Sequence, residues 1–276
     1  MTWTAELLQD SLNRWNTTME SIWELLLQSP ETFKGGSIWT TIVHINGGLK
    51  AAGYALLVLF FLIGVAQSTI NFRDFQRPEY AIKHFLHFLL AKVAITYGLQ
   101  LMQTIFSVGA GIASTAMSSL GGVENTKVSL PAEIIEATDK MKFMESIPMW
   151  ALALIGSFAI GLISFGLILV IYGRFFKIYM YTAVAPLALS TFGGTGTSSM
   201  GKSFLRSYAS ICVQGVVIVL SCIIFSAFAS SGSPAIVDGS AIMKVWNYLQ
   251  ETFFNMALLV VMILGVNNVV KEMFGL

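Results

Sequence analysis

Charged residues are scarce in this chain. Asp, Glu, Lys and Arg make up 11% of its 276 residues, whereas about a quarter is usual in soluble domains. Hydrophobic residues make up 55%. This balance excludes a soluble globular domain and predicts a polytopic membrane protein. The formal net charge is +1 and Lys and Arg are not clustered, so we expect no stable nucleic-acid binding.

Cysteine and histidine are also rare, with two and three residues respectively. Cys212 and Cys222 lie in one apolar run, and ten residues of helix separate them by about 15 Å, which excludes a disulfide between them. The histidines are scattered and give no metal-ligand spacing. We therefore expect no metal site, and we expect no cofactor. The first residues, MTWTAELLQD, lack a basic region and an apolar core, so we expect no cleavable signal peptide.

The chain contains several long apolar runs. The clearest, Leu49 to Ile70, has no charged residue beyond Lys50 at its entrance and is long enough to cross a bilayer. Another runs from near Ala81 to Ser119, and as one helix of about 58 Å it must project beyond the bilayer or bend. Further runs begin near Ile147, Phe204 and Val245. The sequence predicts an all-α integral membrane protein with about five transmembrane helices, one short broken or re-entrant helix and an N-terminal amphipathic helix.

The N-terminal segment, Ala5 to Leu27, has the spacing of one apolar helix face. Acidic and polar residues occupy much of the other side. Such a helix either lies on the membrane surface or offers its apolar face to a neighbouring subunit. We assign residues 1–47 to an extracytoplasmic helix and linker, and 48–276 to a polytopic transmembrane domain. The apolar face consists of Leu8, Leu12, Trp15, Met19, Ile22 and Leu26.

A polar stripe follows the helix predicted from Ala81 onward. Its members fall within about 80° of one another at 100° per residue. A lysine inside hydrocarbon costs a few kcal/mol unless it is paired, faces water or reaches the interface. The stripe either forms interhelical hydrogen bonds or lines a conduit or subunit seam. It consists of Lys92, Thr96, Gln100, Gln103, Ser107, Ser114 and Ser118.

Two further patterns concern helix packing and the longest polar loop. Residues 121–146 form an extracytoplasmic loop in which Pro131, followed by AEIIEATDKMKFM, predicts a short surface helix. In the third crossing, from Ile147 to Tyr172, Ala153, Ser157 and Gly161 are four residues apart. Small residues at this spacing allow a second helix to approach closely, so we interpret them as a packing face.

Around Pro186 the apolar pattern is interrupted. Arg174 and Lys177 are expected to close the third crossing, and the apolar run from Ile178 to Phe192 is too short for a full crossing. Proline removes a backbone hydrogen bond, so we predict a short broken or re-entrant helix there. The Gly-rich loop 193–203 would then be flexible and cytoplasmic, with cations at the membrane interface. These segments supply Pro186, Gly193, Gly194, Gly196 and Gly201, and the cations Arg174, Lys177, Lys202 and Arg206.

The segment GTSSMGKS, residues 196–203, matches the phosphate-loop pattern G-x-x-x-x-G-K-[ST]. That chemistry requires a preceding buried strand and a carboxylate for the metal. The preceding run contains Pro186 and lies among apolar helices, and Asp238 is the only later carboxylate candidate. We therefore interpret the match as a loop without nucleotide chemistry.

Cytoplasmic loops are enriched in Lys and Arg. With a re-entrant segment after Tyr172, most loop cations fall on one side, together with the C-terminus, and most acids on the other. This predicts an N-terminus outside and a C-terminus inside the cell. Two functions fit such a chain: a subunit of a larger membrane complex, or a self-contained small-solute transporter or channel. Only one broken segment is visible and no buried acids cluster, which favours the complex subunit.

The stretch from Tyr172 to Val219 resembles the TrbL-like family of inner-membrane channel subunits of type IV secretion and conjugation systems. The resemblance rests on a basic turn, an apolar Ala185-Pro186-Leu187 segment, a small-residue loop from Gly193 to Gly201, and an aromatic start to the next helix at Phe204 and Tyr208. The acidic N-terminal helix is similar to that of short members from Gram-positive mobile elements.

The resemblance implies a non-enzymatic membrane channel or platform subunit in the bacterial cytoplasmic membrane. Its implied partners are further copies of itself in a homo-oligomer, transport ATPases, a bitopic scaffold subunit and the lipid bilayer. Single-stranded DNA with its attached relaxase, or protein, would pass only transiently. Pro186 and the Gly193 to Gly201 loop would shape the subunit core and its cytoplasmic face.

Overall fold

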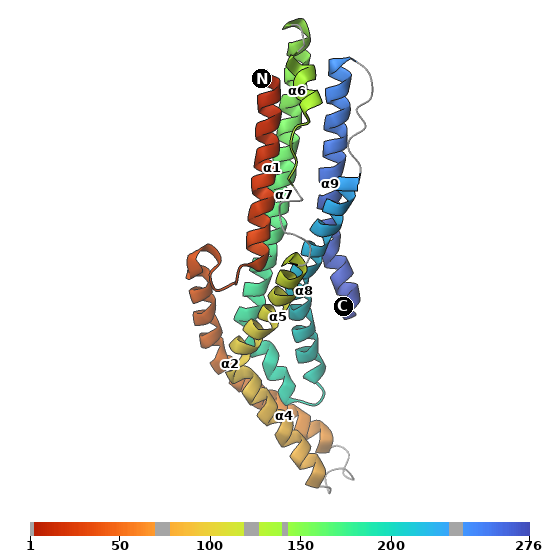
Figure 1. The fold of residues 1–276 in the computed structure, drawn as a ribbon. Helices are drawn as coiled ribbons and strands as arrows, with labels where there is room; N and C mark the ends of the chain where they lie inside the picture. The colour runs from red at the N-terminus through yellow and green to blue at the C-terminus, as the bar shows by residue number, and fades with distance from the viewer. Residues whose placement is uncertain (1–2, 70–77, 119–126, 140–142, 232–239) are drawn as a thin grey trace. The chain divides into compact units, whose positions relative to one another are not determined.

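The computed structural model describes residues 3–69, 78–118, 127–139, 143–231 and 240–276. Within these ranges the chain is helical and contains no strand, which confirms the all-α prediction. Figure 1 shows the order of the elements. They are α1 (Trp3–Leu27), η1 (Phe33–Gly36), α2 (Ser37–Thr69), α4 (Pro78–Thr96), α5 (Gly98–Ser118), α6 (Ala132–Asp139), α7 (Phe143–Leu189), η3 (Ser190–Gly193), α8 (Ser198–Ser231) and α9 (Ala241–Phe274).

Among the described residues, four helices are long and apolar enough to cross a membrane: α2, α7, α8 and α9. The pair α4 and α5 passes the same test together and is bent by 72° at Tyr97, so the number rises to five if the pair is one span. The prediction of a multi-pass protein with about five membrane helices is confirmed. The predicted bend or projection of the segment after Ala81 is resolved as a bend.

The break expected near Pro186 is absent. Helix α7 is 47 residues long and continues through Arg174, Lys177 and Pro186 to Leu189. The prediction that a third crossing ends at Arg174, followed by a separate broken helix, was therefore wrong. The broken helix of this fold is the α4–α5 pair, and the contacts of Pro186 described below explain why α7 persists.

The helices belong to two compact units, and α5, α7, α8 and α9 contribute to both. The first unit comprises Met1–Leu27, Ala113–Gly173 and Val216–Asn267. The second comprises Gln28–Ile112, Arg174–Gly215 and Asn268–Leu276. Helix α2 runs without interruption across residues 47 and 48, where the sequence suggested a boundary.

In the first unit, the apolar face of α1 is buried. Leu8, Trp15 and Ile22 are 2%, 1% and 0% exposed, and the rest of the predicted face is equally covered. The Ser11 hydroxyl donates to Ser157 Oγ at 2.7 Å, which joins α1 to the first half of α7. The spacing identified the correct face, but this chain covers that face itself, so neither a bare surface helix nor a free docking face is present.

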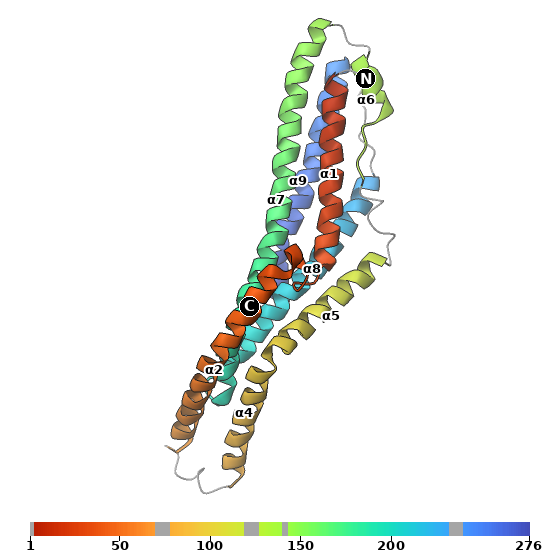
Figure 2. The same ribbon diagram turned by 90° about the vertical axis from the view of Figure 1, so that its left-hand side faces the viewer.

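In the second unit, α2 and α4 form an antiparallel helical hairpin (Figure 2). The Phe61 and Phe88 rings lie 5.1 Å apart, and the Tyr54 and Thr96 hydroxyls are 2.9 Å apart. The hairpin joins a core that also includes residues of α5, α7 and α8. That core contains Leu57, Ala91, Ile95, Met102, Phe106, Ile178, Ala185, Leu189, Tyr208, Ile211 and Cys212.

The outer surface of this hairpin is apolar. Large side chains of both helices are about half exposed there, which is the arrangement expected of helices that face lipid. Helix length agrees, because the 19 residues of α4 rise about 30 Å, the thickness of a bilayer hydrocarbon core, and α2 is longer. The exposed side chains are Val58, Leu59, Leu62, Ile63, Ile82, Phe85, Leu86, Leu89, Leu90 and Val93.

Candidate functional site at the proline of α7

Pro186 lies inside α7, where its ring leaves the carbonyl of Thr182 without its usual helical donor. The side chain of Asn46, from α2, fills that role: its Nδ2 donates to the Thr182 carbonyl at 2.7 Å. Asn46 is 1% exposed, so no water replaces this bond. An unpaired buried carbonyl would be costly. The amide from α2 therefore lets α7 continue through its proline.

Helices α2 and α7 also approach each other closely at Gly53, about two turns beyond Asn46 on α2. A Cβ at Gly53 would lie 2.7 Å from the carbonyl oxygen of Pro186 and 3.2 Å from its Cβ. Real Cβ contacts are not that short, so the crossing requires glycine. Asn46 and Gly53 together make the proline turn of α7 a docking point for α2.

The Gly-rich segment that follows α7 is packed, which corrects the prediction of a flexible loop. A Cβ at Gly194 would lie 2.7 Å from the carbonyl oxygen of Phe60, and one at Gly193 would overlap Leu57. Gly201, in the first turn of α8, is buried against Thr191. Gly196 is exposed and lies nearest Gln67. Glycine here allows backbone-to-backbone packing on α2.

The phosphate-loop pattern occupies the same place. Its residues follow α7 and η3, which are helical, and residues 198–203 form the start of α8. Lys202 is exposed on the first turns of that helix. The described residues before the pattern thus do not supply the buried strand on which the phosphate-binding geometry depends.

Arg174 is buried inside the second unit, with 3% of its surface exposed. Its Nε and one terminal nitrogen donate to the carbonyls of Ile211 and Cys212 in α8, each at 3.2 Å. The guanidinium lies 5.7 Å from the ring centre of Phe106. A Cβ at Gly215 would lie 2.6 Å from the guanidinium, so a glycine there makes room for the arginine.

Arg174 therefore does not lie at the surface, where an interface anchor would lie, and it holds α7 to α8 instead. The reason is that α7 continues past it, so the residue falls within packed helices. Lys177, Lys202 and Arg206 are exposed. Their role at the cytoplasmic interface stays a prediction.

The bend between α4 and α5 is braced by α2. The Lys50 ammonium donates to the carbonyl of Thr96 at 3.1 Å, and Tyr54 bonds to the Thr96 hydroxyl. Thr96 also donates to the carbonyl of Lys92 at 2.8 Å. Lys92 itself is exposed. Two side chains of α2 therefore stabilise the break between α4 and α5.

The bend divides the predicted polar stripe. Lys92 and Thr96 belong to α4, whereas Gln100, Gln103 and Ser107 belong to α5, which runs in another direction. Gln100 and Ser107 are exposed, and Gln103 donates to Glu31 at 2.7 Å. The stripe is thus not one continuous face. Its role as a conduit or seam stays a prediction.

The predicted packing face lies in the first unit. Ala153 is buried and Ser157 bonds to Ser11, while Gly161 is exposed with open space around it. The close approach of α7 to α9 occurs instead at Gly156, where a Cβ would lie 3.3 Å from the ring of Phe253.

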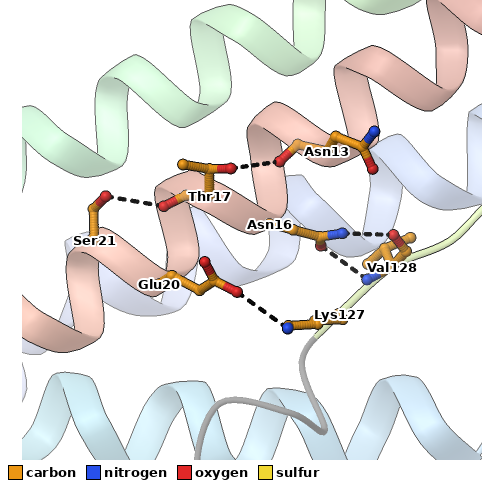
Figure 3. Close-up of polar contacts among 7 residues, drawn as sticks. All are labelled: Asn13, Asn16, Thr17, Glu20, Ser21, Lys127 and Val128. Carbon is orange, nitrogen blue, oxygen red and sulfur yellow. Dashed lines mark hydrogen bonds and ion pairs between the residues drawn. The ribbon is translucent and has the colours of Figure 1, made fainter.

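The segment before α6, which includes Lys127 and Val128, is bonded to α1, as Figure 3 shows. The Asn16 amide donates to the carbonyl of Val128 at 2.8 Å and accepts from the Val128 N–H at 2.9 Å. Lys127 and Glu20 form an exposed ion pair at 3.2 Å. The helix expected after Pro131 is present as α6. Residues 121–126 and 140–142 of the predicted loop lie outside the described residues.

Asn16, Asn46, Gly53 and Gly215 were not identified from the sequence. One feature of the sequence could have identified Asn46: it is an amide side chain in an apolar helix, and another membrane helix of the chain contains a proline. Among the described residues, no three His, Cys, Asp or Glu side chains are placed to hold a metal ion. The contacts described here join helices within each of the two units.

A family model described as TrbL/VirB6 plasmid conjugal transfer like protein matches residues 15–186. The match covers more than half of the chain, including the second half of α1, all of α2, the bend and Pro186. No curated protein and no solved structure matches the chain significantly. The chain therefore belongs to the TrbL/VirB6 family, as a multi-pass membrane component of a conjugal transfer system that works with other transfer proteins.

Proposed function

We propose that this protein is a channel or platform subunit of a conjugative type IV secretion system and takes part in the transfer of DNA or protein across the bacterial cytoplasmic membrane. The observation that carries the proposal is the family match across the second half of α1, all of α2 and the braced α4–α5 bend. The self-contained solute transporter remains the rival function.

The packing supports a framework role. Helix α7 is fixed to α2 through Asn46 and Gly53, and to α8 through Arg174. Such contacts suit a subunit that keeps its shape while other proteins act on it. On this proposal, copies of the chain assemble with one another, with a bitopic scaffold subunit and with transport ATPases. The N-terminus lies outside the cell and the C-terminus inside.

The polar residues at the bend are the best candidates for the path of a polyanion. Helix α5 contains no charged residue, and its exposed Gln100, Thr104 and Ser107 offer neutral hydrogen-bonding groups. Lys92 adds an exposed cation one turn before the bend. An acid-lined path would repel DNA, whereas a neutral one does not. We infer that these residues border the path or a subunit seam.

The test places a photo-crosslinking amino acid at Thr104 in donor cells, with Phe85 on the lipid-facing side of α4 as the matched control. During mating, the Thr104 probe should capture transferred single-stranded DNA and the Phe85 probe should not. Deletion of the gene should abolish transfer. If deletion leaves transfer intact, the proposed function is wrong. If deletion abolishes transfer but neither probe captures DNA, the chain supports the path without lining it.

Two further measurements separate the rival functions. Lys92→Leu should lower transfer or assembly, and wild-type levels of both would remove Lys92 from the path or seam. Mass measurement of the purified particle should give a multimer or a complex with an ATPase. A monomer that takes up a small solute would favour the transporter.

A further inference from the structure

The α2–α4 hairpin defines a membrane boundary at its bend. One arm runs from Lys50 to Thr69 and the other from Pro78 to Thr96, and each rises about 30 Å. Their outer side chains are apolar and exposed up to Val93. At the level of the bend lie the half-buried Lys50 and Tyr97, whose side chain is 59% exposed. Lysine and tyrosine are typical of the interface between hydrocarbon and water.

Lys92 agrees with this boundary. It lies four residues before Thr96, which places its Cα about 6 Å below the bend. A lysine side chain is long enough to bring its ammonium to the interface from that depth. The cost of a lysine within hydrocarbon is avoided without a buried partner.

Helix α5 leaves this boundary at a large angle. The bend between α4 and α5 is 72°. Membrane-spanning helices tilt by about 20° on average, so a helix bent by this much from α4 lies closer to the membrane plane than to its normal. A helix in the plane at this level would be at the interface.

The side chains of α5 are distributed as an interfacial helix requires. At 100° per residue, three sectors of about 60° follow one another around the helix. One is buried against α8, where the Tyr208 hydroxyl donates to the Met102 carbonyl at 3.0 Å and Gly109 meets the backbone of Cys212. The next is apolar and at least partly exposed, and the third is polar and exposed. The apolar sector holds Leu101, Ile105, Val108 and Ile112, and the polar sector Gln100, Thr104, Ser107 and Gly111.

We propose that α5 is not part of a membrane crossing but lies in the lipid interface, with its Leu101–Ile105–Val108–Ile112 edge inserted among the acyl chains and its Gln100–Thr104–Ser107 face in water. The occupant of the apolar edge is lipid. Three observations carry this assignment: the bend, the lysine and tyrosine residues at the bend, and an apolar sector directly beside a water-facing one. Helices of this kind bury their apolar face about 5–10 Å into the boundary between headgroups and acyl chains.

The test measures the depth of single nitroxide labels in the full-length protein, with Cys212 and Cys222 replaced by alanine. The protein is reconstituted in vesicles of phosphatidylcholine and phosphatidylglycerol at 3:1. Labels are placed at Ile112→Cys on the apolar edge and at Ser107→Cys on the polar face. Leu89→Cys, exposed midway along α4, is the matched control for a membrane-spanning position.

We expect the Leu89→Cys label to be deep, with oxygen far more accessible than a water-soluble nickel complex. The Ile112→Cys label should be oxygen-accessible and shallow, about 5–10 Å below the headgroups, and the Ser107→Cys label should favour nickel. An Ile112→Cys label as deep as that at Leu89→Cys would show that α5 crosses the bilayer. If neither oxygen nor the nickel complex reaches the Ile112→Cys label, protein covers the edge. If only the nickel complex reaches it, the edge is in water. Each of these three results overturns the proposal, and the Leu89→Cys reading confirms insertion independently of transfer activity.

Discussion

Replacing Asn46 by leucine tests why α7 passes through Pro186 without breaking. Leucine has the same number and branching of side-chain heavy atoms as asparagine but cannot donate to the Thr182 carbonyl, which Asn46 reaches at 2.7 Å. A buried carbonyl left unpaired costs roughly 1–3 kcal/mol in soluble proteins. Side-chain hydrogen bonds between membrane helices contribute about 0.6 kcal/mol on average and about 1.7 at most. We therefore expect a loss of about 1–2 kcal/mol.

The Pro186→Ala variant makes this prediction specific. Alanine restores an N–H that can donate to the Thr182 carbonyl within α7, and it keeps the Cβ and carbonyl that Gly53 contacts. In that background, Asn46→Leu should cost less than about 0.5 kcal/mol. The coupling between the two positions should then be about 1 kcal/mol, within the range seen for groups that share one interaction.

The assay is thermal unfolding of the four proteins in one detergent, followed by tryptophan fluorescence. For a chain of this size, 1 kcal/mol corresponds to roughly 2–4 °C in Tm. Asn46→Leu should therefore lower the apparent Tm by about 2–8 °C in the native background and by less than about 2 °C in the alanine background. An equal drop in both backgrounds would show that Asn46 matters for packing alone. No drop in either would show that the Thr182 carbonyl needs no partner, and the reasoning would be wrong.

Three further predictions use the same thermal assay or a protease. Gly53→Ala should lower the apparent Tm, because its Cβ would lie 2.7 Å from the Pro186 carbonyl oxygen. Gly47→Ala, on the same helix, meets open space and should raise stability by up to about 1 kcal/mol. Equal effects of the two substitutions would contradict the close approach of α2 and α7. Gly215→Ala should destabilise the protein, because its Cβ would overlap the Arg174 guanidinium, and adding Arg174→Met should relieve most of that loss. If the stability losses of the two single variants add in the double variant, the pairing of Gly215 with Arg174 is refuted. Asn16→Leu should break both hydrogen bonds to Val128, release the segment before α6 from α1 and speed trypsin cleavage after Lys127. Asn13→Leu, at an exposed position of α1, should not change the cleavage rate. Equal cleavage rates in the two variants would show that the two bonds do not hold this segment on α1.

The sequence alone determined the class of the protein and the buried face of α1. Low charge and long apolar runs define a membrane protein because a bilayer excludes unpaired charge, and that argument needs no tertiary contact. The spacing from Leu8 to Leu26 identified a face that is buried in the structure. Helix length likewise required the segment after Ala81 to bend or project.

Tertiary structure decided where the helices break. Proline leaves one carbonyl of its helix without a backbone donor. The donor that replaces it here, Asn46, lies 136 residues from Thr182 in the chain. The break at Tyr97 has no proline, and side chains of α2 hold it. The sequence shows which backbone groups a residue leaves unpaired, but only the packed helices show which distant side chain pairs with them.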